Sequence, residues 1–336
     1  MNLVVEQLYS PNELARELPF HAGHKEQVEK HREEVNRIMC GENHRKLVVV
    51  GPCSIHDPKA ALEYGQRLAE LQKQLPDVLL VMRVYFEKPR TTVGWKGYVN
   101  DPHLNDTFDL NYGLHCARRL CLDLLDIGLP LATEVLDPFT IKYLSGIFSW
   151  VAIGARTTES QTHREIASGL PMCVGFKNGT NGSAQVAIDA MKSAAFPHRY
   201  LGMDNNGNVG IVHAVGNKNT HIVLRGGDKG PNYHEDDIVD VLDDLYHAGV
   251  NQSVMVDCSH SNSEKDFTRQ PGVAKEVLKA GFQLVKGFMI ESHLNEGSQK
   301  ISRDMKYGVS VTDACIGWEQ TVKTLTEIDQ YAKRKD

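Results

Sequence analysis

The sequence lacks the long apolar segments of membrane proteins and the leading segment of secreted ones. No apolar run approaches the roughly 18 residues that cross a bilayer, and residues 1–7 have neither the basic nor the apolar region of a signal peptide. Positive charge is not massed either, because 37 Lys and Arg residues are scattered among 43 Asp and Glu residues, for a net charge of −6. These absences argue against nucleic acid or a membrane as the main partner, and we expect a cytoplasmic protein.

Cysteine and glycine motifs are also missing. The seven cysteines form an odd set without CxxC spacing, which disfavours a disulfide framework and a structural zinc site. No GxGxxG or GxxxxGK[ST] follows the first predicted strand, which argues against an open doubly wound sheet that binds nucleotides. With 336 residues, 41% of them hydrophobic, the chain can still bury a full globular core.

What the sequence does contain is a strand and helix pattern that repeats eight times. Short apolar runs typical of strands buried on both faces lie at 47–53, 78–86, 130–136, 150–156, 172–178, 221–226, 253–260 and 284–291. Segments with helical spacing follow them at 58–74, 107–128, 138–148, 160–169, 183–194, 235–248, 264–280 and 313–333. Alternating βα units without a break in composition predict a (β/α)₈ TIM barrel.

Two pieces exceed the roughly 250 residues of such a barrel. The first is an N-terminal extension over residues 1–45, where a helix is expected near 24–40 with a thin apolar stripe formed by Val28, Val35, Ile38 and Met39. The second is a β-hairpin at about 199–216, signalled by Asp204-Asn205-Asn206-Gly207-Asn208 and inserted into the barrel domain of residues 46–336.

Each predicted strand ends in a polar or ionisable residue. Since the chemistry of a TIM barrel sits at the carboxyl ends of its strands, these residues are candidates for one active site. They are Cys53, Arg83, Glu134, Arg156, Lys177, Arg225, His260 and Glu291. Any one of them alone could be an ordinary packed or paired side chain, but all eight would not fall on the catalytic rim by accident.

Most of these residues, together with Asp313, sort into two chemical sets, and a loop after the second strand suggests a further anion site. Cys53, His260, Glu291 and Asp313 offer a thiolate, an imidazole and two carboxylates, which suit Mn²⁺, Fe²⁺, Co²⁺ or Zn²⁺ better than Ca²⁺ or Mg²⁺. Four cations would repel one another without a ligand of several negative charges, such as a phosphate plus a carboxylate; these are Arg83, Arg156, Lys177 and Arg225. Lys88-Pro89-Arg90-Thr91-Thr92 suggests a second anion site.

Several motifs resemble the type I 3-deoxy-D-arabino-heptulosonate-7-phosphate (DAHP) synthases. The resemblance spans about residues 40–330 and includes Gly51-Pro52-Cys53-Ser54, Glu87-Lys88-Pro89-Arg90-Thr91, Gly154-Ala155-Arg156-Thr157-Thr158-Glu159-Ser160, Gly175-Phe176-Lys177-Asn178-Gly179-Thr180, Leu224-Arg225-Gly226-Gly227 and Thr312-Asp313-Ala314-Cys315-Ile316. It implies a metal-dependent transferase that joins phosphoenolpyruvate to erythrose 4-phosphate with release of phosphate, the first step of the shikimate route to aromatic amino acids. It also implies a homodimer or homotetramer.

The resemblance assigns roles to individual residues. Phosphoenolpyruvate is expected on Arg83, Arg156, Lys177 and Arg225, with backbone near Glu134 and Ala155. The sugar phosphate is expected on Lys88, Pro89, Arg90 and Thr91. The catalytic group would comprise Lys88, a candidate proton donor, and the metal-type residues Cys53, His260 and Asp313, with the metal polarising the aldehyde.

Feedback by an aromatic amino acid is also implied, with the extension and the hairpin helping to build the effector site. The segments Pro130–Glu134, Met255–His260 and Met305–Ser310 look most like the tyrosine-regulated isozymes, and Gly202 fits them too. Pro171 departs from the family, which commonly has a serine there at the border of the effector pocket. An effector hydrogen bond could therefore be missing, because proline has neither a hydroxyl nor an N–H.

Three alternatives stay open from the sequence. The related synthase that uses arabinose 5-phosphate shares the barrel and the chemistry, but the Lys-Pro-Arg-Thr loop and the hairpin argue against it. A metal-dependent aldolase of lyase type would need fewer cations. A non-catalytic sensor of aromatic amino acids is disfavoured because all four metal-type residues are present.

Overall fold

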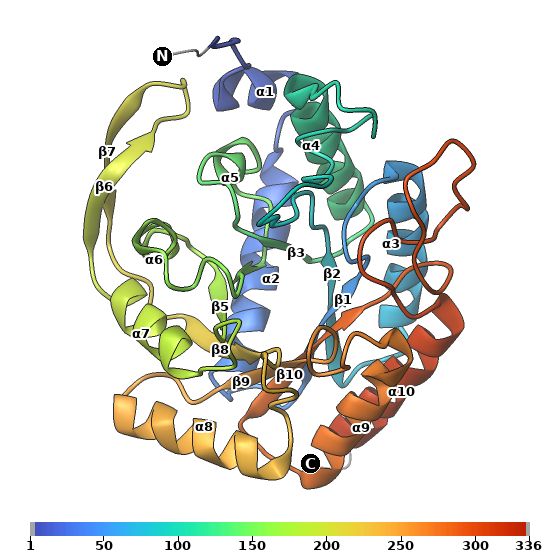
Figure 1. Cartoon of the computed structure of the whole chain (residues 1–336). Coiled ribbons are helices and arrows are strands. Elements are labelled where there is room, and N and C mark those ends of the chain that lie inside the picture. Colours follow the sequence, from blue (N-terminus) through green and yellow to red (C-terminus); the bar gives the residue numbers. More distant parts are fainter. Residues whose placement is uncertain (1–3, 334–336) are drawn as a thin grey trace.

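The computed structural model describes residues 4–333 and contains a closed barrel of eight parallel strands (Figure 1). The few residues outside that range, 1–3 and 334–336, belong to the predicted extension and barrel domain but lie outside the described structure. The strands are β1 (Lys46–Gly51), β2 (Val78–Arg83), β3 (Leu131–Glu134), β4 (Trp150–Ile153), β5 (Cys173–Lys177), β8 (Thr220–Leu224), β9 (Val254–Asp257) and β10 (Val285–Glu291). They pair in the order β1-β10-β9-β8-β5-β4-β3-β2, which confirms the predicted (β/α)₈ fold.

Alternating residues of the strands belong to two hydrophobic cores, one between the barrel and its outer helices and one inside the barrel. In β1, Val48 and Val50 pack outward under the helices, whereas Leu47 and Val49 join the packing inside the barrel. This alternation explains why the strands read as continuous apolar runs, since both faces of the sheet are buried. The outer helices are α3 (Pro58–Gln72), α4 (Leu110–Asp126), α5 (Thr140–Tyr143), α6 (Gln161–Ser168), α7 (Gln185–Ala194), α8 (Glu235–Ala248), α9 (Gln270–Ala280) and α10 (Trp318–Lys333).

Helix α2 (Ala22–Met39) forms the floor of the barrel at the amino ends of the strands. Its Val35, Ile38 and Met39 belong to the same buried cluster as the interior strand residues, and the hydroxyl of Ser253 donates a hydrogen bond to the carbonyl of Met39. The apolar stripe predicted for this helix is confirmed as buried. The extension therefore completes the core of the barrel, although the barrel pattern alone did not require it.

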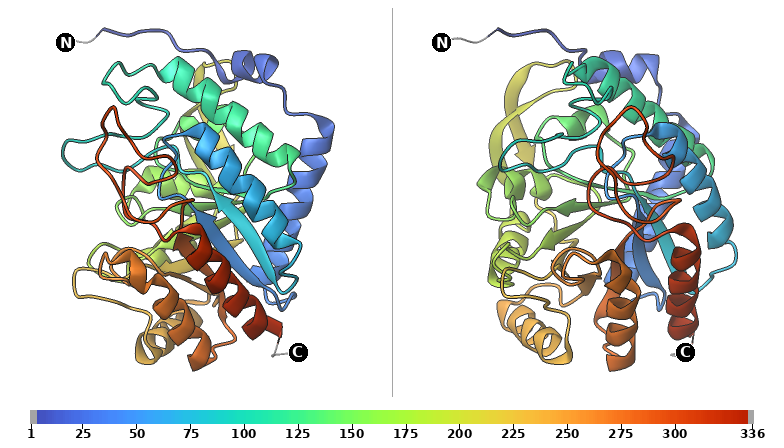
Figure 2. Two further views of the ribbon diagram at one scale, coloured as in Figure 1. Left: turned by 90° about the vertical axis from the view of Figure 1, so that its right-hand side faces the viewer. Right: turned by 45° about the vertical axis from the view of Figure 1, so that its right-hand side comes forward.

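The inserted hairpin is formed by β6 (His198–Met203) and β7 (Val209–Ala214), which pair antiparallel outside the barrel sheet. In Figure 1 it arches along the left edge from α7 toward helix α1 (Pro11–Glu17). At its turn Gly207 has φ +86°, and the Asn12 N–H donates to the Asn205 carbonyl at 2.8 Å. The extension and the hairpin, far apart in sequence, thus meet beside the barrel (Figure 2).

The largest differences between the predicted boundaries and the structure occur at three places. Helix α5 spans only Thr140–Tyr143 of the predicted 138–148, and the chain turns at Gly146 with φ +88°. A short 3₁₀ turn, η1 (Phe267–Arg269), precedes α9 where one helix from 264 was expected. Asp313 does not open the last helix, which begins at Trp318; it lies in the preceding loop, beside the bridge between Cys315 and Gly297.

Replacing Ile38 by alanine tests the floor of the barrel. Ile38 is fully buried in the interior cluster, so Ile38→Ala should lower the free energy of unfolding by about 2–5 kcal/mol. Glu33→Ala, on the exposed side of the same helix, is the matched control and should change it by less than about 0.5 kcal/mol. Denaturant titration measures both, and equal small effects would mean that α2 packs only loosely on the barrel.

Candidate active site

A cavity of about 310 Å³ opens at the carboxyl ends of the barrel strands. Most of the residues singled out from the sequence line it: Arg83, Lys88, Pro89, Arg90, Glu134, Ala155, Arg156, Lys177, Arg225, His260, Glu291 and Asp313. Cys53 is fully buried directly beside this group. Thr91 is exposed and does not line the cavity.

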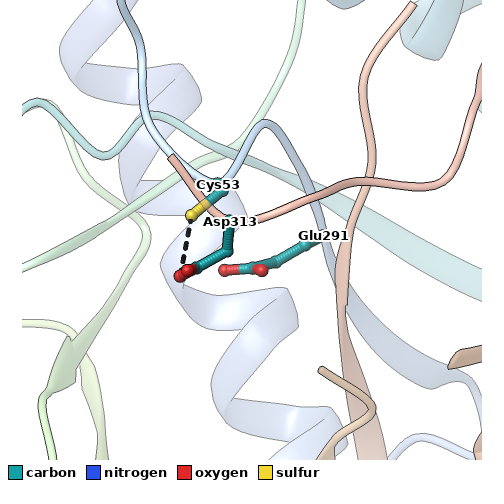
Figure 3. A group of neighbouring side chains, drawn as sticks. All are labelled: Cys53, Glu291 and Asp313. Carbon is teal, nitrogen blue, oxygen red and sulfur yellow. Dashed lines mark hydrogen bonds between the residues drawn. The ribbon is translucent and has the colours of Figure 1, made fainter. Parts of the chain in front are cut away.

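A thiol and two carboxylates converge on one side of the cavity (Figure 3). The ligand atoms of Cys53, Glu291 and Asp313 all lie within 4.8 Å of one another, and the Cys53 thiol donates to Asp313 Oδ2 at 3.4 Å. Cys53 follows β1, Glu291 ends β10, and Asp313 comes from the loop before α10. Gly51, at φ +150°, lets the backbone pack closely against Arg83, because the Cβ of any other residue there would lie 3.1 Å from the Arg83 carbonyl oxygen.

The imidazole of His260 stands next to this cluster in a fixed orientation. Its Nδ1 lies 2.9 Å from Asp257 Oδ2 and 2.8 Å from the Ser259 hydroxyl, while its Nε2 lies 4.0 Å from Glu291 Oε1. A carboxylate on one ring nitrogen leaves the other free to bind a metal, an arrangement common around metal-ligating histidines. His260 adopts a left-handed backbone with φ 54°, which is uncommon for a residue other than glycine.

Two of the four predicted cations form buried ion pairs. Arg83 Nη2 lies 3.3 Å from Glu291 Oε1, and Lys177 Nζ lies 2.9 Å from Asp257 Oδ2. Burial alone would raise the pKa of Asp257, but the charges of Lys177 and His260 outweigh it and hold that pKa well below the usual range. Arg156 and Arg225 line the same cavity from the ends of β4 and β8.

Lys88 connects the cation set to the thiol and carboxylate cluster. Its Nζ lies 3.0 Å from Cys53 Sγ and 3.6 Å from Asp313 Oδ2. Burial and the nearby Glu291 carboxylate raise the pKa of Cys53 to about 12, so this thiol is protonated at neutral pH. Burial opposes ionisation of Asp313 too, but Lys88 and His260 lower its pKa to about 2.

Sequence reasoning missed the residues that hold the others in place. Asp257, at the end of β9, contacts both Lys177 and His260. The side chain of Gln270 donates to the Glu291 carbonyl at 2.9 Å and accepts from the Glu291 N–H at 2.8 Å. An aspartate closing an apolar strand was a visible signal in the sequence, whereas nothing in the sequence pointed to Gln270.

A second cavity, of about 390 Å³, contains both residues predicted for the effector site. Pro171 and Gly202 line it together, from the segment before β5 and from the hairpin strand β6. Apolar side chains form much of its wall, and they include Phe148, Ile166, Met203 and Val212. The hairpin and the segments around α5 and α6 thus enclose a cavity separate from the one above the strands.

Comparison with known proteins identifies the family. The profile described as the DAHP synthetase I family matches residues 23–326. The chain belongs to this family. It is 53% identical over 330 residues to the Tyr-sensitive phospho-2-dehydro-3-deoxyheptonate aldolase of Escherichia coli (strain K12). This alignment covers 96% of this chain and 92% of that protein. The Phe-sensitive aldolase of the same strain is 48% identical over 337 residues, in an alignment that covers 98% of this chain and 96% of that protein.

A solved structure of a related protein shows the same architecture. The phospho-2-dehydro-3-deoxyheptonate aldolase from Francisella tularensis SCHU S4 matches with a TM-score of 0.97 and 46% identity, covering 99% of both chains. The family membership confirms the resemblance drawn from the motifs and favours it over the three alternatives left open by the sequence. Across residues 4–333, none of the helices is long and apolar enough to span a membrane.

Proposed function

We propose that this member of the DAHP synthetase I family condenses phosphoenolpyruvate with D-erythrose 4-phosphate and water to give DAHP and phosphate, the first step of the shikimate route. The observation that carries the proposal is that one cavity brings together four cations and a thiol, imidazole and carboxylate cluster. A phosphate and a carboxylate on one small substrate match the cations, and an aldehyde to be activated matches the cluster.

Phosphoenolpyruvate fits the side of the cavity lined by Arg83, Lys177, Arg156 and Arg225. The ion pairs with Glu291 and Asp257 fix the first two side chains before substrate arrives, so little ordering is needed on binding. Arginine suits this task because its planar guanidinium donates two parallel hydrogen bonds to a carboxylate or phosphate. The Ala155 backbone and Glu134 border the same space.

Erythrose 4-phosphate fits the loop after β2. Lys88, Pro89 and Arg90 line the cavity, and Thr91 follows them at the exposed edge. Arg90 Nε donates to the Trp95 carbonyl at 3.0 Å, which holds the guanidinium on its own loop near the cavity entrance. The sugar's phosphate would lie at this entrance, and its aldehyde would face Lys88 and the thiol and carboxylate cluster.

A divalent metal fits among Cys53, His260, Glu291 and Asp313. The donor set combines one soft sulfur ligand with harder nitrogen and oxygen ligands, which suits Mn²⁺, Fe²⁺, Co²⁺ or Zn²⁺. Three of the four ligand atoms already lie within 4.8 Å of one another, and the Asp257 carboxylate orients the histidine. When bound, the metal would act as a Lewis acid on the aldehyde oxygen.

The side chains of the cavity supply the remaining chemistry. The enol carbon of phosphoenolpyruvate attacks the aldehyde carbon, and water adds to the neighbouring carbon of phosphoenolpyruvate. The bond from that carbon to the phosphate oxygen then breaks, while the new hydroxyl becomes the ketone of DAHP and its proton passes to the departing phosphate. The Lys88 ammonium, held near Cys53 and Asp313, is placed to give a proton to the former aldehyde oxygen. Glu134 is a carboxylate within the cavity that can take a proton from the water.

Removing a metal ligand should abolish turnover without unfolding the protein. Cys53→Ser and His260→Ala should each lower kcat by at least about 100-fold, because both remove a strong ligand. Cys40→Ser, at an exposed cysteine away from the cavity, should leave kcat unchanged. Phosphate release before and after EDTA, with metal content measured, checks the prediction. Full turnover by verified metal-free enzyme would rule out the metal role.

Two arginine variants should separate the substrates. Arg156→Ala should raise the KM for phosphoenolpyruvate by about 10-fold or more, since it removes a charged partner of an oxyanion. Arg90→Ala should mainly raise the KM for erythrose 4-phosphate. Steady-state kinetics with each substrate varied in turn measures both effects. Similar small changes for both substrates would mean that these side chains contribute only general positive potential.

The second cavity is the proposed site for an aromatic amino acid that inhibits the enzyme. Its apolar wall suits an aromatic ring, while Arg32 and Lys142 supply cations for the effector carboxylate. Arg32 also donates to the carbonyls of Phe148, at 2.9 Å, and Gly146, at 3.1 Å, so it ties α2 to this wall. Tyrosine is the favoured effector, because the Tyr-sensitive relative is more similar than the Phe-sensitive one from the same strain.

Inhibition should be strongest with tyrosine and modest in strength. Pro171 offers the cavity no hydroxyl, and a missing hydrogen bond of about 0.5–1.5 kcal/mol corresponds to roughly 2- to 10-fold weaker binding. Pro171→Ser should recover that factor. Separate titrations with tyrosine, phenylalanine and tryptophan decide the matter, and phenylalanine or tryptophan as the strongest inhibitor would contradict the tyrosine assignment.

The proposed enzyme is a homo-oligomer in the cytoplasm. The hairpin exposes the apolar side chains of Leu201, Val209 and Ile211 at 81%, 80% and 69%, and a cluster of exposed apolar side chains is typical of an interaction surface. A homodimer or homotetramer that covers this surface, with the 1–45 extension taking part in assembly and regulation, accounts for it. The enzyme is expected to work in the cytoplasm, where both substrates are phosphorylated metabolites.

A further inference from the structure

Two buried donors in the wall of the active-site cavity have no hydrogen-bond partner among the described residues. They are the hydroxyl of Tyr85 and the Nη1 group of Arg83, and both side chains line the cavity. Tyr85 is only 2% exposed and Arg83 only 1%. Since nearly all buried polar groups in proteins are paired, two unpaired donors on side chains that line one cavity point to a ligand that accepts from both.

The surrounding structure fixes the Tyr85 ring. The Arg83 guanidinium carbon lies 4.0 Å from the centre of that ring, a cation–π contact. Arg83 is itself fixed by Glu291 Oε1 at 3.3 Å and by the Pro52 carbonyl at 3.4 Å. The Tyr85 carbonyl accepts from the Ile55 N–H at 2.9 Å, so the backbone is fixed as well. The hydroxyl therefore has little freedom to find a partner elsewhere.

The electrostatic setting keeps the phenol protonated. Burial is the main cause that raises the pKa of Tyr85 far above its usual value, and the Arg83 charge only partly offsets it. A protonated phenol beside a guanidinium offers an O–H donor to an anion without adding negative charge. A buried hydroxyl left without a partner destabilises the protein, and a bound anionic oxygen would remove that penalty.

We propose that Tyr85 is a further substrate-binding residue, whose hydroxyl donates a hydrogen bond to an anionic oxygen of phosphoenolpyruvate beside Arg83. This inference rests on the proposed function and extends it to a residue that is neither a cation nor a metal ligand. The cavity would thus hold this substrate with a neutral donor as well as with positive charge. Such a donor fixes orientation, because a hydrogen bond is directional and a general positive potential is not.

The test compares two variants that each lose one buried hydroxyl. Tyr85→Phe keeps the ring under Arg83 and removes only the donor, so the KM for phosphoenolpyruvate should rise about 10-fold or more. Its KM for erythrose 4-phosphate and its metal content should stay unchanged. Tyr143→Phe is the matched control, because that hydroxyl donates to the Tyr9 carbonyl at 2.7 Å and does not line the cavity. It should leave both KM values unchanged.

The outcomes distinguish this inference from the proposed function. If the wild-type enzyme forms DAHP while Tyr85→Phe keeps the wild-type KM for phosphoenolpyruvate, the hydroxyl makes no substrate contact and the inference is overturned. If the wild-type enzyme forms no DAHP, the proposed function itself fails. An increase in both KM values together with metal loss would indicate that Tyr85 only supports Arg83, which would also overturn the inference.

A second measurement covers the case in which Tyr85→Phe does not fold. Fluorotyrosine placed at position 85 retains the hydroxyl and reports its surroundings by ¹⁹F NMR. Addition of phosphoenolpyruvate alone should shift this resonance, whereas the same label at Tyr143 should not respond. An unmoved resonance at position 85 under saturating substrate would overturn the inference independently of the kinetic comparison.

Discussion

The buried carboxylate of Asp257 is the contact on which the active site depends. Its Oδ2 lies 2.9 Å from both Lys177 Nζ and His260 Nδ1, and its Oδ1 accepts from the Ser259 hydroxyl at 2.6 Å. One side chain at the end of β9 thereby connects a proposed phosphate-binding cation to a proposed metal ligand. A charge with no solvent exposure is stable only because these partners compensate it, so its loss would leave Lys177 buried without its counter-charge.

A second buried pair joins β2 and β10, the two strands that flank β1. Arg83 and Glu291 lie 3.3 Å apart at 1% and 2% side-chain exposure, and Gln270 holds the backbone of Glu291 through two hydrogen bonds. Ion pairs of this kind contribute little net stability, because desolvation offsets their attraction. These ion pairs instead hold the charged side chains in position before substrate binds. The barrel floor, completed by α2, supports the strands that carry them.

The sequence predicted the barrel and most of the cavity for one physical reason. Strands buried on both faces must be continuously apolar, so the polar residues that end them stand out, and parallel strands bring those ends to one rim. The same reasoning could not show that α2 closes the barrel, because periodicity reports burial and not the surface that is covered. Helix α1 was missed although Ser10 and Glu13 form a capping box that the sequence displays. Asp257 was missed although an aspartate that closes an apolar strand is visible in the sequence. Gln270 was missed because it acts through contacts between α9 and Glu291 at the end of β10, which spacing along one segment does not reveal.

We propose that one cavity unites a metal site with the cations that bind phosphoenolpyruvate. A crystal grown with Mn²⁺ and phosphoenolpyruvate tests it directly through anomalous scattering. We expect one strong manganese peak bounded by Cys53, His260, Glu291 and Asp313, with the substrate's phosphate and carboxylate on Arg83, Arg156, Lys177 and Arg225. A manganese peak elsewhere, or phosphoenolpyruvate bound away from these four cations, would contradict it.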